Sequence, residues 1–164
     1  MILLNSVLVA TDFGDPSRSA LEYGRNLAGA FGATLHLLHV AARVMPVSAA
    51  EFDPTNLQDL QAEIVDDANR QLNLLLTDND RAQLRAKPVV LTSTSAAHTI
   101  VEYAKETHAG LIIIGTHGRG GISHLLMGSV AEHVVRTAPC PVLVVRPNEH
   151  EFILPDPVSV SARI

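Results

Sequence analysis

Residues 115–129 read GTHGRGGISHLLMGS, and the other elements of the chain can be placed from this stretch. It follows four aliphatic residues at 111–114, a run that is typical of a buried parallel strand. Residues 130–135, VAEHVV, then have the composition of a helix start. Glycines let backbone N–H groups approach an anion, and a helix N-terminus adds unpaired N–H groups of its own. The order of strand, glycine-rich loop and helix therefore predicts a phosphate-binding loop.

The spacing of the glycines excludes two common kinds of phosphate loop. A Walker loop requires a Gly-Lys pair, and the chain contains none. The dinucleotide-binding fingerprint requires a third glycine where this chain has Ser123. The pattern that remains is G-x2-G-x9-G-[ST], formed by Gly115, Gly118, Gly128 and Ser129. A flexible surface loop is the structural alternative for these glycines.

Three further segments agree with this pattern: VLVATD at residues 7–12, HV at 39–40 and PCPVLVVR at 139–146. Together with the glycine spacing they resemble the universal stress protein family, in its nucleotide-binding branch. The resemblance covers residues 1–147, which it identifies as one α/β domain. Residues 148–164 depart from the usual family ending and are expected to form a C-terminal tail, which has the length to wrap over its own domain or its partner; the sequence does not decide whether it does.

The order of the expected elements leads to the same fold class. Strands are predicted over residues 6–11, 34–40, 86–92, 110–114 and 142–146, with helices between them. Right-handed crossovers then give a Rossmann-like, doubly wound, five-stranded parallel sheet with helices on both faces. Pro88 cannot donate to a ladder, so its strand belongs at an edge, and the strand order 3-2-1-4-5 is predicted. Asp12 and Gly115 would then meet in one crevice at the carboxyl ends of the strands, where such sheets bind nucleotides.

Two helices are expected to bury apolar stripes. The first begins near Pro16, ends near Gly32 and is predicted to bury Ala20, Gly24, Leu27, Ala28 and Phe31. The second is long, and its stripe is assigned to the core, with a partner-binding surface as the alternative: Leu57, Leu60, Ile64, Ala68, Leu72 and Leu75. His36 and His39 are interpreted as strand residues and not as metal ligands, because no second ligand has a recognisable spacing.

Composition narrows the classes of partner. A chain of 164 residues with 47% hydrophobic and 18% charged residues is expected to form one compact domain. The net charge of −5 and the lack of a basic stripe argue against nucleic acid. No apolar run approaches the roughly 20 residues that a membrane span needs. The single cysteine and the lack of a secretory signal indicate the cytoplasm.

The family resemblance implies a set of nucleotide-binding residues. The adenine and ribose end would be lined by Ala10, Thr11, Asp12 and Val40. Phosphate would be bound by Gly115, Gly118, Gly128, Ser129 and Val130, with Thr116, His117 and Arg119 lining the loop between the first two glycines. The ligand would be ATP, with AMP or ADP as alternatives, and Ser129 could meet a Mg or Mn ion. Residues 122–127 would close over the nucleotide as a flap, while Asp12 alone could also be a helix cap.

Catalytic functions are less well supported by the residues. A hydrolytic triad of Asp12, His117 and Ser129 lacks the G-x-S-x-G turn of hydrolases. Phosphoryl-acceptor signalling would need a lysine after the fifth strand, and Lys87 and Lys105 lie elsewhere. No catalytic residue is assigned, and slow ATP hydrolysis is the most that is expected.

Two functions of different class therefore remain. The first is an ATP-binding, dimeric regulator in the stress response, and the second is a stress-linked interaction module that needs no nucleotide. The bare apolar edge of the fifth strand invites pairing. By resemblance it would pair with its own copy, so a homodimer through residues 142–145 is predicted.

Overall fold

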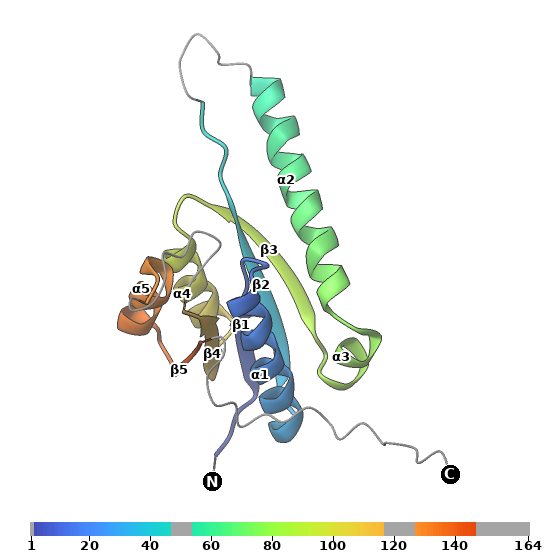
Figure 1. Ribbon diagram of the computed structural model, residues 1–164, viewed down its shortest axis with the longest axis vertical. Helices are drawn as coiled ribbons and strands as arrows, with labels where there is room; N and C mark the ends of the chain where they lie inside the picture. Colours follow the sequence, from blue (N-terminus) through green and yellow to red (C-terminus); the bar gives the residue numbers. More distant parts are fainter. Residues whose placement is uncertain (1, 47–53, 117–126, 147–164) are drawn as a thin grey trace, which may run out of the picture.

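The computed structural model describes residues 2–46, 54–116 and 127–146. Within them strands and helices alternate along the chain, except that α3 follows α2 directly (Figure 1). The elements are β1 (Ser6–Ala10), α1 (Asp15–Phe31), β2 (Thr34–Ala42), α2 (Pro54–Leu75), α3 (Asp78–Gln83), β3 (Lys87–Ser93), α4 (Ala96–Glu106), β4 (Leu111–Gly115), α5 (Ser129–Thr137) and β5 (Val142–Val145). The expected tail at 148–164 lies outside the described residues.

The five strands form one parallel sheet in the order β3-β2-β1-β4-β5. This confirms the predicted fold class and strand order. Pro88 stands on the edge strand β3, in register with Leu37 of β2, where its missing N–H costs least. β1 and β4 are neighbours, with Ala10 in register with Ile114, so the chain leaves both strands at the same end of the sheet.

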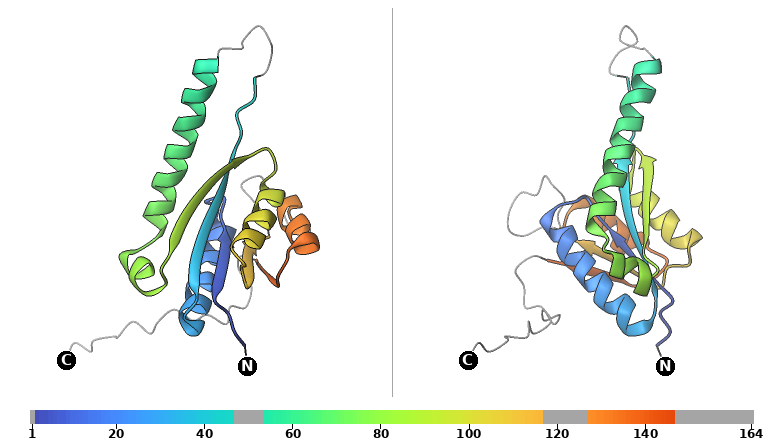
Figure 2. Two further views of the ribbon diagram at one scale, coloured as in Figure 1. Left: turned by 180° about the vertical axis from the view of Figure 1, so that it is seen from behind. Right: turned by 90° about the vertical axis from the view of Figure 1, so that its right-hand side faces the viewer.

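Helices cover both faces of the sheet, α1 and α2 on one and α4 and α5 on the other (Figure 2). Alternate strand residues supply the two cores, because successive side chains point to opposite faces. In β1, Val7 and Val9 join the core under α1, while Leu8 and Ala10 join the core under α4 and α5. None of the described helices has the length and apolar content that crossing a bilayer requires.

The predicted stripe of α1 is correct except at its end. Ala20, Gly24 and Ala28 are buried, but Phe31 is 43% exposed. A 17-residue helix is about 25 Å long, whereas the five residues of β1 span about 16 Å. The last turn of α1 therefore overruns the sheet, and the helix stops at Gly32, whose φ of 64° suits glycine.

The assignment of the whole α2 stripe to the core is wrong for its first half. Ala68 and Leu72 are buried, whereas Leu60 is 46% exposed. With 22 residues the helix is about 33 Å long, and its N-terminal half extends past the sheet (Figure 1). Gln61 still connects this half to the end of β2, since its side chain accepts from the Val44 N–H at 2.8 Å.

An ion pair fastens the short helix α3, which the sequence analysis did not predict, to α1. The Nε of Arg25 donates to the Asp80 carboxylate at 3.0 Å, and its Nη2 donates to the other carboxylate oxygen at 2.9 Å. Nη2 also donates to the Leu75 carbonyl at 2.6 Å. Asp80 is 3% exposed and closes a capping box with Thr77 at the start of α3.

Candidate functional site

The chain makes a tight turn immediately after β1. The Phe13 N–H donates to the Thr11 hydroxyl oxygen at 3.0 Å, and the Gly14 N–H donates to Oδ1 of Asp12 at 3.1 Å. Phe13 has a φ of 69°, a left-handed value that is uncommon for a residue with a side chain. These side-chain bonds to the backbone hold the turn in that conformation.

The side chain of Thr11 is fully used inside the protein. The Ser17 hydroxyl donates to the Gly14 carbonyl at 2.8 Å, so the Thr11 hydroxyl is the donor in its 3.0 Å bond with Ser17. The same Thr11 oxygen accepts from Phe13, and the residue is 7% exposed. Thr11 was predicted to line the nucleotide site. Its backbone is engaged as well, since its N–H donates to the Leu38 carbonyl and its carbonyl accepts from His39, both at 2.9 Å.

Among the described residues, Asp12 carries a buried side-chain oxygen without a partner at this end of the sheet. Its Oδ2 is shielded from solvent and accepts no hydrogen bond from any residue that the structure describes. An unpaired buried acceptor costs about 1–3 kcal/mol, which a ligand N–H or O–H would recover. Gly14 keeps the space beside this carboxylate open, because a Cβ at that position would lie 3.4 Å from Oδ2. The alternative role of Asp12 as a helix cap is not found, because Gly14 is the N-cap of α1 and that helix has no side-chain cap bond. Oδ1 of Asp12 instead closes the turn that precedes the helix.

The exit of β4 and the start of α5 are bonded to each other. The Gly128 N–H donates to the Thr116 carbonyl at 2.6 Å, and the Thr116 N–H donates to the Val145 carbonyl at 3.0 Å. Gly128 is the N-cap of α5 and offers no side chain to the first N–H groups of that helix. The two ends of the glycine stretch thus meet beside an uncapped helix N-terminus, an arrangement that suits an anion.

Gly115 has a packing role that spacing alone did not reveal. A Cβ at this position would lie 2.8 Å from the carbonyl carbon of Pro16 and 2.8 Å from its Cβ. The end of β4 therefore rests directly on the first turn of α1. Because β1 and β4 are also parallel neighbours, the exits of both strands lie beside the first turn of α1.

The remaining predicted residues are only partly described. Ala10 and Val40 belong to the core under α4, while Ser129 and Val130 are exposed on the first turn of α5. The three loop residues His117, Gly118 and Arg119, and the part of the expected flap at 122–126, lie outside the described residues. The described parts of the predicted nucleotide site are thus the turn after β1, the end of β4 and the start of α5.

The two strand histidines make hydrogen bonds inside the fold. Nδ1 of His36 lies 2.7 Å from the Tyr103 hydroxyl, and burial lowers the pKa of His36, with the Lys87 charge adding to the effect. Nδ1 of His39 donates to the Thr11 carbonyl at 2.9 Å. In the described part of the chain, no three His, Cys, Asp or Glu side chains are grouped so that they could hold a metal ion.

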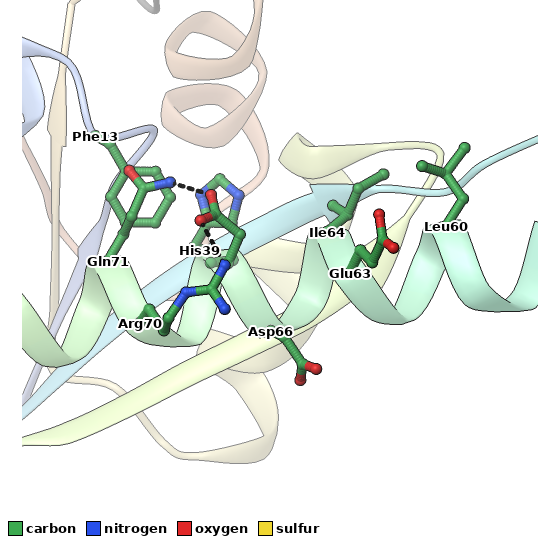
Figure 3. A pocket seen from close by; sticks show the side chains of 10 residues that line it. Phe13, His39, Leu60, Glu63, Ile64, Asp66, Arg70 and Gln71 are labelled. Atoms are coloured by element: carbon green, nitrogen blue, oxygen red, sulfur yellow. Dashed lines mark hydrogen bonds and ion pairs between the residues drawn. The ribbon is translucent and has the colours of Figure 1, made fainter.

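A pocket of about 500 Å³ lies on the other side of the turn, between the turn and α2 (Figure 3). Phe13 and His39 form one wall, with ring centroids 4.4 Å apart, and residues 60–71 of α2 form the other. None of the described residues predicted for nucleotide binding lines it. The sequence analysis missed this pocket, and the only available signal was the turn chemistry of Thr11, Asp12 and Gly14, which foretells an unusual backbone at Phe13.

Comparison with known proteins gives one consistent result. The model of the Universal stress protein family matches residues 4–146. Universal stress protein MJ0531 of Methanocaldococcus jannaschii is 30% identical over 151 residues, which cover 91% of this chain and 86% of the relative. Universal stress protein UspA from Lactobacillus plantarum has a similar solved structure, with a TM-score of 0.72 and 28% identity over 89% of this chain and 100% of that one.

Some similar structures were solved with adenine nucleotides. A universal stress protein in complex with cAMP matches with a TM-score of 0.55 and 25% identity, over 88% of this chain and 98% of its own. A protein from Archaeoglobus fulgidus with dAMP and one from Arabidopsis thaliana with AMP are 20% and 17% identical, at TM-scores of 0.52 and 0.59. Each match covers 88% of this chain, together with 99% of the Archaeoglobus protein and 92% of the Arabidopsis protein. At identities this low, the two structures support the fold alone.

Proposed function

This chain belongs to the universal stress protein family, and from that premise we propose that it binds an adenine nucleotide in the crevice where β1 and β4 end. ATP is the proposed ligand, with AMP and ADP as alternatives. The nucleotide would be a regulatory ligand in the stress response, and its presence would alter the surface that the protein offers to partners.

The observation that carries the proposal is the buried Oδ2 of Asp12, which lacks a partner among the described residues. A carboxylate oxygen can only accept, so its complement is a donor such as the adenine amino group or a ribose hydroxyl. Ala10 and Val40, on the α4 side of the neighbouring strands, would supply apolar surface for the base.

The start of α5 would bind the phosphates. Its first N–H groups receive no side-chain cap from Gly128, and the helix dipole places partial positive charge there. Ser129 and Val130 are exposed on this turn and would contribute backbone donors, together with the glycine loop. The Ser129 hydroxyl would donate to phosphate or meet an accompanying Mg or Mn ion.

We also propose that the regulator is a homodimer, because β5 is an edge strand of bare aliphatic residues. Pairing of Val142–Val145 with the same strand of a second copy would extend the sheet across a two-fold axis. The domain would then comprise residues 1–147, with 148–164 as an appended tail.

A thermal-shift experiment with Gly128→Val tests the nucleotide site. Gly128 has an extended backbone, with φ −60° and ψ 151°, which valine also adopts, so the variant should fold. ATP at about 100 times its dissociation constant should stabilise the natural chain by about 2.7 kcal/mol. The valine side chain should abolish that gain, whereas Val135→Leu, exposed further along α5, should retain it.

Two results would oppose the proposal. If Gly128→Val kept the full ATP shift, the phosphates would not lie at the start of α5. If the natural chain gave no shift with ATP, ADP or AMP, the nucleotide-independent interaction module would be the better account.

A further inference from the structure

The pocket beside α2 has walls of two kinds. One is aromatic, formed by Phe13 and His39 at the carboxyl ends of β1 and β2. The other is the face of α2, where Leu60 and Ile64 supply apolar surface and Glu63 supplies a carboxylate (Figure 3). A volume of about 500 Å³ lies within the usual range for small-molecule sites.

The aromatic wall is held in place before any ligand arrives. The backbone N–H of Phe13 donates to Thr11, its φ is fixed at 69°, and its ring contacts that of His39 at an interplanar angle of 33°. The His39 ring is itself anchored by its bond to the Thr11 carbonyl. A ligand that contacts Phe13 would therefore meet a preorganised surface.

The helical wall carries an excess of negative charge. Three acidic residues line the pocket, Glu63, Asp66 and Asp67, against the single basic residue Arg70. Nη2 of Arg70 donates to Asp67 at 3.1 Å, so this positive charge is paired with one of the three acidic residues. Glu63 and Asp66 have no hydrogen bond or ion pair within the part of the chain that the structure describes.

We propose that this pocket binds a small organic cation with a flat apolar body, such as an aromatic amine. The body would pack between Phe13 and the aliphatic side chains of α2, and the ammonium group would pair with Glu63 at the rim. Positive charge near an aromatic face is favourable in itself, and the surplus carboxylates add to it.

The proposed cation site is separate from the proposed nucleotide site. Phe13 packs on the core under α1, whereas Ala10 and Val40 belong to the core on the opposite face of the sheet. Asp12 does not line the pocket. The two proposals therefore fail or succeed independently.

A series of probes with one body and different charges tests the proposal. Tryptamine, tryptophol and indole-3-propionate share an indole ring and a two-carbon linker, and carry a positive, a neutral and a negative group. Titrations followed by NMR should give the tightest binding for tryptamine, about fivefold tighter than tryptophol, as one partly exposed ion pair predicts. Resonances of Phe13 and Ile64 should move, and the difference between the two probes should shrink at about 0.5 M NaCl.

Two variants separate charge from fold. Glu63→Gln combined with Asp66→Asn should bring tryptamine and tryptophol to equal affinity, while Asp59→Asn, exposed on the same helix outside the pocket, should leave the fivefold difference unchanged. Equal affinities for all three probes in the natural chain would overturn the proposal. So would shifts confined to Ser129 and Val130, or no shifts at millimolar tryptamine.

Discussion

At the scale of single residues, Asp12 does two things with its two carboxylate oxygens. Oδ1 closes the turn after β1 by accepting from Gly14, and Oδ2 is buried without a partner in the described part of the chain. The hydrogen bond between the Gly14 N–H and Oδ1 therefore both closes the turn and fixes the position of Oδ2. The place of Asp12 after a strand predicted it as a site residue. Which oxygen bonds to Gly14 and which is left without a partner depends on the side-chain conformation, which the sequence does not specify.

The substitution Asp12→Asn should separate these roles. The asparagine side chain can still accept from the Gly14 N–H with its amide oxygen, but an NH2 group would then stand where Oδ2 accepts. Nucleotide affinity should fall about tenfold, the cost of one lost acceptor, while the unliganded fold should lose little stability. Isothermal titration with ATP measures the first effect and urea unfolding the second. Asp15→Asn, at a highly exposed position in the same region, is the control that should bind normally.

Gly115 offers a second test at this scale, against a matched glycine. Alanine at 115 would place its Cβ 2.8 Å from the Pro16 backbone and should destabilise the fold by about 1–3 kcal/mol. Alanine at Gly29, within α1, would meet only the Leu84 side chain at 3.7 Å and should stabilise the fold by about 0.5–1 kcal/mol. Urea unfolding of both variants provides the comparison, and equal effects would show that β4 does not press on α1.

At the scale of elements, the sequence was a good guide wherever one local rule decided the outcome. Pro88 placed β3 at an edge, and the helix start predicted at residues 130–135 lies within α5. Phe31 and Leu60 were misassigned because periodicity shows which face is apolar but not how far a helix overruns its sheet. The pocket at Phe13 could not be foreseen, since it depends on how α2 is set against the sheet.

The link between α1 and α3 was also missed, although Thr77 and Asp80 carry a capping-box signal. Asp80→Ala should cost about 1.5–3 kcal/mol, because it removes the buried partner of Arg25 and the capping box with Thr77, while Arg25 keeps its exposed pair with Glu22. Glu132→Ala, which removes an exposed i,i+4 pair with Arg136, should cost less than about 0.5 kcal/mol. The denaturant midpoints of the two variants measure these losses of stability. A loss for Asp80→Ala as small as that for Glu132→Ala would mean that the ion pair with Arg25 does not hold α3.

The same pair gives stability a dependence on pH. Burial acts to raise the pKa of Asp80, but hydrogen bonds from Arg25 and Thr77 outweigh it, so the pKa lies below its ordinary value. The folded state therefore holds this carboxylate ionised where the unfolded chain would take up a proton. The contribution of the Asp80 carboxylate to the free energy of unfolding is complete above the ordinary Asp pKa. It is lost as the pH falls through the lower pKa that Asp80 has in the folded state. In Asp80→Ala the acid limb of the stability curve should be shallower than in the natural chain.

At the scale of the whole molecule, β5 leaves one edge of the sheet open to a second copy. The Ile112 N–H donates to the Pro141 carbonyl and the Thr116 N–H to that of Val145, so residues 141 and 145 face β4. By alternation, Val142 and Val144 turn their backbone groups outward. Val144→Pro should remove an outward donor from each copy of the proposed homodimer and weaken it about tenfold or more.

Sedimentation equilibrium measures this change in association. Leu143→Pro serves as the contrast, since its N–H faces β4 and its loss should destabilise the monomer itself. If Val144→Pro self-associates like the natural chain, the copies do not meet through β5.

The central claim is that an adenine nucleotide lies between the turn after β1 and the start of α5. Backbone amide NMR during titration with ATP tests it most directly, because both segments are observed in one experiment. The largest shifts should fall together on Asp12 to Gly14 and on Ser129 to Ala131, and should saturate at a single dissociation constant. Saturating shifts that leave either segment unmoved, or no shifts at all with ATP, would contradict it.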